Sequence, residues 1–297
     1  MAYLIFVSLV WAFSFGLIKD QLAGLDANFV AAARLTISLV IFLPFLRLRG
    51  VPARLRLRLL LTGAVQYGLM YVAYTYSFQF LAAHEVALFT IFTPLYVTLV
   101  NDLFQRRFHA VSLMATLLAV AGTAIVKQGS LLQPELLTGF LIVQLSNLAF
   151  AFGQVNYKEA LKDRTGFNDA AVFGLLYLGG VIAAGVPALI TTPWQSLALT
   201  GSQILALLYL GAIASGICFF LWNVGARKVH TGTLAVFNNL KIPLGVTASL
   251  LFFGERTSIP HLLAGGAVML AALVINERSA RRTALPEQAA ASERADL

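Results

Sequence analysis

The chain has 297 residues, of which 59% are hydrophobic and only 11% are charged, and its mean hydropathy is +0.81. Soluble domains carry about 25% charged residues, so this composition excludes a soluble protein and indicates a membrane protein. The net charge of +8 does not indicate a nucleic-acid partner, because that needs basic residues gathered on a soluble face. A single cysteine, Cys218, excludes a disulfide framework and a multi-cysteine metal site.

Apolar runs long enough to cross a bilayer follow one another along the chain. About 20 residues at 1.5 Å each span the ~30 Å of hydrocarbon. Since these runs do not alternate with polar residues, they favour helices over a barrel. We therefore predict an all-α membrane protein with ten transmembrane helices, at 2–18, 27–46, 59–80, 85–101, 109–127, 136–157, 170–190, 203–225, 231–253 and 260–276.

Lys and Arg residues are divided unequally between the two sides of this arrangement. With both termini in the cytoplasm, the outer loops hold only Lys19, Lys127 and Arg256 of the 21 basic residues. Two more, Arg34 and Lys241, fall within spans, so sixteen of the 21 lie on the inner side. By the positive-inside rule both termini are predicted to be cytoplasmic, in a multi-pass protein of the bacterial inner membrane.

The chain also contains an internal repeat, in which three pairs of segments match in the same order. The paired segments are WAFSFG at 11–16 and LAFAFG at 148–153, TGAVQYG at 62–68 and LGAIASG at 210–216, and FTPLYVTL at 92–99 and KIPLGVTA at 241–248. We predict two five-helix repeats, 1–128 and 129–276, followed by a disordered cytoplasmic tail, 277–297. An odd number of spans inverts the second copy, which is the architecture of secondary transporters with a site near the midplane. Chance similarity between apolar segments is the alternative.

Arg34 and Lys241 are the candidates for binding an anionic substrate. An ionisable side chain within a span costs at least ~2.5–3.5 kcal/mol, so it is rare unless it faces a cavity or a partner. No acidic residue is expected at the depth of Lys241, which favours an anionic ligand over a carboxylate or helix-end carbonyls of the protein. Arg34, nearer the outside, either snorkels outward or provides a second contact to the ligand's carboxylate.

Neutral polar and aromatic residues complete the predicted site. Proline lacks a backbone donor, so Pro94 and Pro243 are expected to kink their helices and to leave carbonyls unbonded. Asn238 and Asn239 either satisfy such carbonyls or line the site. The other candidates either face the substrate or pack between helices; they are Gln144 and Asn147 on the sixth helix, Tyr67, Tyr71 and Tyr74 on the third, and Trp11 and Trp222.

Catalytic motifs are absent from the sequence, which has no HExxH, Gly-x-Ser-x-Gly or phosphate-binding loop. We therefore predict no enzyme activity, no cofactor and no metal, and transport that is driven by a gradient or facilitated. His84 and Glu85 form either a proton relay or a helix cap.

Ten helices in two copies, each with a proline in its fourth helix, resemble the EamA-type carboxylate, amino acid and amine transporters of the drug/metabolite transporter superfamily. In that family the fourth helix of each copy usually closes with Gly-Glu. The second copy ends in this way, with SLLFFGE at 249–255, whereas the first reads VNDLFQR and has Arg106 in place of the glutamate.

Longer strings are similar to a group of bacterial high-affinity biotin transporters within this superfamily. They are WAFSF at 11–15, FLPFLRLRG at 42–50, LFTIFTPLYVTL at 88–99, VQLSNLAFAFG at 143–153 and GTLAVFNNLKIP at 232–243. The resemblance implies import of biotin, a small carboxylate, across the inner membrane. Export of amino acids or related metabolites, and a sensor or assembly role without transport, stay open, as does the oligomeric state.

Overall fold

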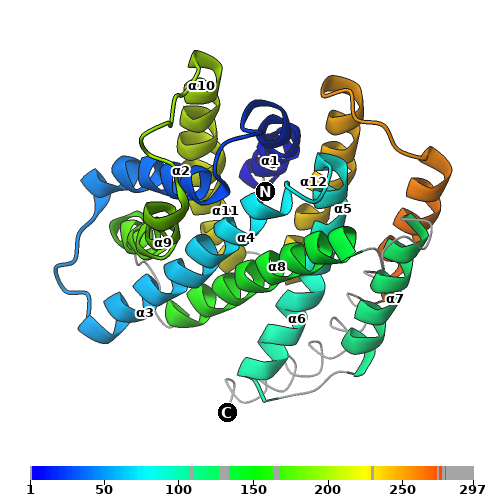
Figure 1. The fold of residues 1–297 in the computed structure, drawn as a ribbon. Coiled ribbons are helices and arrows are strands. Elements are labelled where there is room, and N and C mark those ends of the chain that lie inside the picture. Colours follow the sequence, from blue (N-terminus) through cyan, green and yellow to red (C-terminus); the bar gives the residue numbers. More distant parts are fainter. Residues whose placement is uncertain are drawn as a thin grey trace, which may run out of the picture.

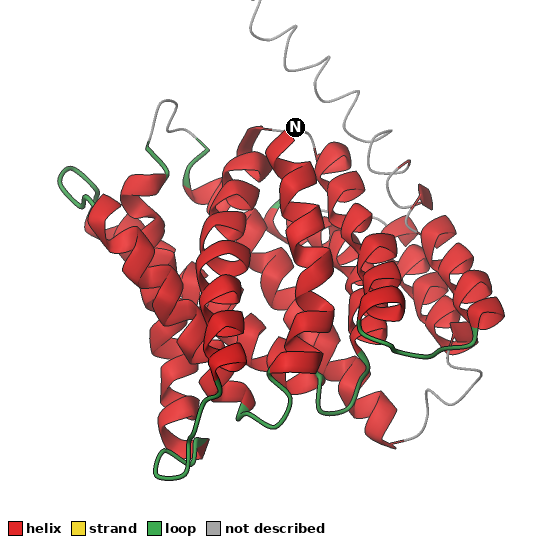
Figure 2. Ribbon diagram, turned by 90° about the horizontal axis from the view of Figure 1, so that it is seen from above, coloured by secondary structure: helices red, strands yellow, loops and turns green. Residues whose placement is uncertain are grey.

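The computed structural model describes residues 2–106, 110–126, 134–162, 168–228 and 231–272, together with 274, 275 and 278. Within this part of the chain all regular secondary structure is helical, and no strand occurs (Figure 2). The prediction of an all-α protein is confirmed. The predicted tail, 277–297, lies outside the described residues apart from Arg278.

The helices follow the predicted segments in chain order (Figure 1). Their bounds are α1 Ala2–Gln21, α2 Ala27–Phe42, α3 Ala53–Gly63, α4 Met70–Ser77, α5 Ala83–Phe89, α6 Thr93–Phe104, α7 Ala110–Val126, α8 Pro134–Ala160, α9 Ala170–Thr191, α10 Gly201–Tyr209, α11 Cys218–Lys228 and α12 Thr231–Phe252, with a last helix at Ile259–Ala272. Short 3₁₀ turns occur at η1 Leu43–Phe45 and η3 Thr90–Phe92. Where two labels adjoin, as in α5, η3 and α6, the helical rod is continuous.

Six helical stretches of the described chain are long and apolar enough to cross a membrane. They are Tyr3–Gln21, Ala27–Phe45, Ala83–Phe104, Pro134–Ala160, Ala170–Thr191 and Gly201–Lys228. Large apolar side chains point away from the protein, as for Leu103, Leu189 and Ile190, which are 74%, 72% and 79% exposed. Such a surface is unfavourable in water and suits the lipid tails of a bilayer.

Two helical rods contain a π-helical stretch at positions that the sequence repeat pairs with each other. These are η2, Ala64–Leu69, between α3 and α4, and η5, Leu210–Ile217, between α10 and α11. A π-helical stretch changes the backbone hydrogen bonding, and it is frequent at functional sites. Side chains donate to carbonyls of η5: Ser38 to Gly211, Trp11 to Ala214, and Tyr177 to both Ser215 and Gly216.

The two prolines that are predicted to kink their helices lie in different local structures. Pro94 stands near the start of α6, directly after the 3₁₀ turn η3, so the regular α-helix is interrupted there. Pro243 lies inside α12, which continues through it.

Side chains from distant helices bond the backbone ahead of both prolines. Asn147 Nδ2 on α8 donates to the carbonyl of Phe89 at 2.8 Å, and Ser8 Oγ on α1 donates to that of Phe237 at 3.0 Å. In each pair the donor belongs to one predicted repeat and the acceptor to the other. Inside a membrane no water is available to bond these two carbonyls. The side chains of Asn147 and Ser8 satisfy them instead.

Helix α9 packs very closely on α3, and glycine makes this possible. A Cβ atom at Gly179 would lie 1.9 Å from the carbonyl oxygen of Leu60, whereas a Cβ at Gly185, also on α9, would meet nothing within 4 Å. We expect Gly179→Ala to destabilise the protein by about 1–3 kcal/mol, because overpacking forces the helices apart. Gly185→Ala is the matched control and should leave the melting temperature of the purified protein unchanged or raise it slightly. Equal melting temperatures for the two variants would contradict this account.

The loop after α12 binds the first residues of α5. Gly254, with a φ of 65°, turns the chain there. The carboxylate of Glu255 then accepts the backbone N–H groups of Ala83 at 2.6 Å and His84 at 2.9 Å, and lies 2.7 Å from His84 Nδ1. Glu85 accepts the N–H of Ala82 at 2.9 Å, as a capping residue does. The structure thus places both His84 and Glu85 in a helix cap.

Glu255 should make stability depend on pH. Burial raises its pKa, but the hydrogen bonds from His84 and from the backbone of Ala83 and His84 outweigh burial, so the pKa lies below its ordinary value. A lowered pKa in the folded state stabilises the protein above the unfolded pKa of about 4.3, and this contribution is lost as the pH falls further. We expect Glu255→Gln to cost about 1 kcal/mol at pH 7. The difference in melting temperature from the unsubstituted protein should shrink below about pH 4; a difference that is constant from pH 3 to 7 would contradict the charge-based cap.

Candidate substrate-binding site

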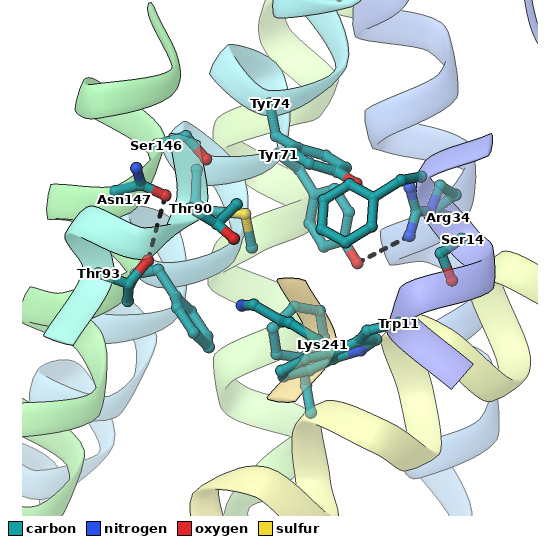
Figure 3. A pocket seen from close by; sticks show the side chains of 14 residues that line it. Trp11, Ser14, Arg34, Tyr71, Tyr74, Thr90, Thr93, Ser146, Asn147 and Lys241 are labelled. Atoms are coloured by element: carbon teal, nitrogen blue, oxygen red, sulfur yellow. Dashed lines mark hydrogen bonds between the residues drawn. The ribbon is translucent and has the colours of Figure 1, made fainter. Parts of the chain in front are cut away.

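A pocket lies among the helices (Figure 3). Its lining comes from both predicted repeats and consists of Trp11, Ser14, Phe15, Arg34, Met70, Tyr71, Tyr74, Thr90, Thr93, Ser146, Asn147, Phe150, Phe219 and Lys241. Both cations that the sequence places within spans therefore face one cavity.

Arg34 is buried, with 2% of its surface exposed, and it points inward instead of snorkelling to the membrane surface. Its Nε donates to Ser215 Oγ at 3.2 Å and its Nη2 to the hydroxyl of Tyr71 at 3.0 Å. The guanidinium carbon also lies 4.4 Å from the centre of the Tyr71 ring. Within the described structure Nη1 is buried without a hydrogen-bond partner. One arm of a fixed guanidinium thus stays available to a ligand.

Lys241, on α12, extends its ammonium group into the same pocket (Figure 3) and is 5% exposed. Its Nζ lies 5.1 Å from the centre of the Trp11 ring and 5.8 Å from that of Phe150. Aromatic faces attract a cation but do not neutralise it. Among the described residues no carboxylate forms an ion pair with Lys241 or Arg34. Two buried cations without a carboxylate partner in the described part of the chain make this cavity suited to an anion.

Asn147 lies on the opposite side of the pocket from Arg34, with Lys241 between them (Figure 3). Its Oδ1 accepts a hydrogen bond from Thr93 Oγ1 at 3.2 Å, and its Nδ2 donates to Phe89 O and, at 3.1 Å, to Gln144 Oε1. These bonds fix the amide, and Oδ1 has room for one further donor. The pocket thus has the guanidinium of Arg34 at one end, hydroxyl and amide groups around Asn147 at the other, and the ammonium of Lys241 between them.

Residues 1–127 and 137–277 match the model of the EamA-like transporter family. The chain belongs to this family. It is 40% identical over 283 residues to the "Probable biotin transporter" of Pseudomonas aeruginosa, which covers 95% of this chain and 99% of that protein. The "Biotin transporter" proteins of Salmonella typhimurium and Escherichia coli are 38% and 36% identical over 280 residues, covering 94% of this chain and 93% of each relative.

A solved crystal structure with 18% sequence identity covers 94% of this chain and 97% of its own, with a TM-score of 0.65. At this identity the likeness concerns the fold alone. Together with the apolar helices, the family membership shows that this EamA-like transporter is a multi-pass protein of the bacterial inner membrane.

Five of the residues predicted for the site lie outside the pocket lining of the EamA-like protein. Three of them bond to other side chains: Tyr67 accepts from Asn223 at 2.9 Å, Trp222 donates to Gln154 at 2.9 Å, and Gln144 accepts from Asn147. Asn238 and Asn239 are buried in α12, and their Oδ1 atoms have no partner in the described part of the chain. Asn239 stands two residues before Lys241, about 200° around the helix, and so points away from the ligand side.

The site also involves residues that the sequence did not single out. Ser215 lies outside the pocket lining but bonds to two residues of it, because the π-helical stretch η5 places its hydroxyl 2.7 Å from that of Tyr71 and 3.2 Å from Arg34 Nε. Thr90 begins the 3₁₀ turn ahead of Pro94, and Thr93 follows that turn. Their position beside a proline could have marked them as site residues in the sequence. Single serines and phenylalanines in apolar helices carry no comparable signal, because most of them only pack.

Proposed function

We propose that the protein imports biotin across the inner membrane as a secondary transporter. The observation that carries the proposal is the pair of buried cations, Arg34 and Lys241, in one pocket without a carboxylate partner among the described residues. The names of relatives that are 36–40% identical over nearly the whole chain support biotin as the anion.

The chemistry of biotin suits the two ends of the pocket. Its valerate carboxylate accepts hydrogen bonds from Arg34 and Lys241, which are strong because both partners are charged. Its ureido ring both donates and accepts, and so matches Asn147 and the neighbouring hydroxyls of Thr93 and Ser146. Its apolar bicyclic body lies against aromatic rings such as Phe150.

The proposed topology has ten transmembrane helices in two inverted repeats, with both termini in the cytoplasm. Its support is the order of the helices, the two π-helical stretches at paired positions, and the match of the family model to two successive segments. In transporters of this kind the substrate binds between the halves, which rock around it. The sequence has no phosphate-binding loop for ATP, so uptake is driven by a gradient or facilitated.

Uptake of labelled biotin tests the proposal. Biotin-auxotrophic cells that lack their own transporter are given this chain or an empty vector, and uptake is measured at nanomolar biotin. We expect uptake well above that of cells with the empty vector. Unlabelled biotin should compete with the labelled biotin, and biotin amide, which lacks the negative charge of the carboxylate, should compete much less. Uptake equal to the vector would overturn the assignment. Efflux of preloaded amino acids would instead favour an exporter with the same fold.

A further inference from the structure

A second pocket lies on the same helices as the substrate pocket. It is lined by Val97, Asn101, Gln154, Val155, Lys158, Glu159 and Ala226. Helix α6 contributes Thr93 to the first pocket and Val97 to the second, and α11 contributes Phe219 and Ala226 in the same way. At 1.5 Å per residue these pairs are separated by about 6 Å and about 10 Å along the helix axes. The two pockets are therefore stacked end to end.

Aromatic rings fill the space between the two pockets. On α8, Phe150 stands between Asn147 of the first pocket and Gln154 of the second. On α11, Trp222 is fully buried and stands between the residues that each pocket takes from that helix. The Trp222 ring centre lies 5.0 Å from that of Trp11 and 6.5 Å from that of Phe150. We call Trp11, Phe150, Phe219 and Trp222 the aromatic wall.

Gln154, which lines the second pocket, bonds to the wall. The indole Nε1 of Trp222 donates to Gln154 Oε1 at 2.9 Å, and Gln154 Nε2 donates to the backbone carbonyl of Phe150 at 3.4 Å. Leaving a buried indole N–H without a hydrogen-bond acceptor costs free energy. The closed position of the Trp222 ring thus depends on Gln154.

We infer that the second pocket is the release vestibule on the inner side and that the aromatic wall is the gate between it and the substrate pocket. This inference rests on the proposed transport function. The vestibule suits a released carboxylate, since it offers the exposed residue Lys158 and the amide of Asn101. Glu159 lies 3.9 Å from Lys162, so its charge has a neighbouring cation. An anion that leaves Arg34 and Lys241 passes the wall and meets Lys158 on the inner side.

Cysteine accessibility tests the stacking of the two pockets. In a Cys218→Ala background, Ser14→Cys reports on the substrate pocket and Asn101→Cys on the vestibule. A membrane-impermeant thiol reagent is applied to vesicles of known orientation. We expect Ser14→Cys to react from the outer side and Asn101→Cys from the inner side. Reaction of both from one side, or the reverse sidedness, would overturn the vestibule.

Variants of the hydrogen bond test the gate. Gln154→Leu and Trp222→Phe each remove one partner, and each should raise the reactivity of Ser14→Cys from the inner side about tenfold or more, the effect of a lost buried hydrogen bond on an opening equilibrium. The double variant should show no larger increase than Gln154→Leu alone, since that change already breaks the bond to Trp222. Gln154→Glu keeps a hydrogen-bond acceptor for Trp222, so the gate should stay closed and the reactivity of Ser14→Cys from the inner side should stay low. Unchanged labelling of Ser14→Cys from the outer side shows that each variant is folded.

The outcomes separate the gate from the substrate. Unchanged inner-side reactivity in both single variants, or additive effects in the double variant, would overturn the gate whatever the uptake assay gives. Failure of biotin uptake in the unsubstituted protein, together with the expected labelling pattern, would overturn biotin as substrate and leave the gate in place.

Discussion

Replacing Arg34 with glutamine is expected to lower kcat/KM for biotin uptake about 100-fold or more. Truncating one partner of a buried, hydrogen-bonded charge pair costs roughly 2–5 kcal/mol, because the other charge is left desolvated and unpaired. Here that other charge is the carboxylate of biotin. The measurement is the initial rate of uptake of labelled biotin as a function of concentration, normalised to the amount of protein in the membrane.

Two further variants distinguish this role from simple packing. Tyr71→Phe removes one hydrogen-bond acceptor of Arg34 but keeps the ring beneath it, so the loss should be about tenfold or less. Arg34→Lys keeps the positive charge but lacks the planar guanidinium. Its loss of kcat/KM should therefore lie between those of Tyr71→Phe and Arg34→Gln. The discrimination of biotin from biotin amide should weaken in Arg34→Gln, since only Lys241 is then left to bind the carboxylate. Undiminished discrimination in a folded Arg34→Gln protein would contradict the contact between Arg34 and the carboxylate.

Replacing Lys241 with methionine is expected to abolish measurable uptake while making the protein more stable. A buried cation without a counter-ion carries a desolvation penalty, and well-packed apolar replacements of buried charges often stabilise by about 1–4 kcal/mol. Methionine has a similar length and fits between the Trp11 and Phe150 rings that now flank the ammonium. Melting temperature in detergent and uptake in cells, measured for the same variant, should move in opposite directions.

Lys228→Met is the matched control for Lys241→Met. Lys228 is exposed at the end of α11 and lines neither pocket. Substitutions at such surface positions change stability by about 0.5 kcal/mol or less, so both uptake and melting temperature should stay close to those of the unsubstituted protein. A fall in the melting temperature of Lys241→Met would mean that a protein group stabilises the ammonium, against the role proposed for the ligand.

The sequence alone could predict that Arg34 lies in an apolar helix long enough to cross a membrane and that Lys241 lies in an otherwise apolar helix. Hydrophobicity and the cost of a charge in lipid depend on the local composition of about 20 residues, so they need no knowledge of the fold. The same is true of the all-helical class, because only intrahelical hydrogen bonds satisfy the backbone of such runs in a bilayer. The family resemblance added the substrate class.

Which side of each helix faces the cavity was decided only by the tertiary structure. Tyr67, Tyr71 and Tyr74 share one predicted stripe, yet Tyr71 and Tyr74 line the pocket while Tyr67 bonds to Asn223 outside it. The π-helical stretches rotate the chain beyond them, and they bring Ser215 to Arg34 across 181 residues of sequence. Periodicity locates an apolar or polar face on a helix, but not the neighbour that the face meets. That neighbour depends on helix packing, and helix packing places Arg34 against Tyr71 instead of at the lipid surface.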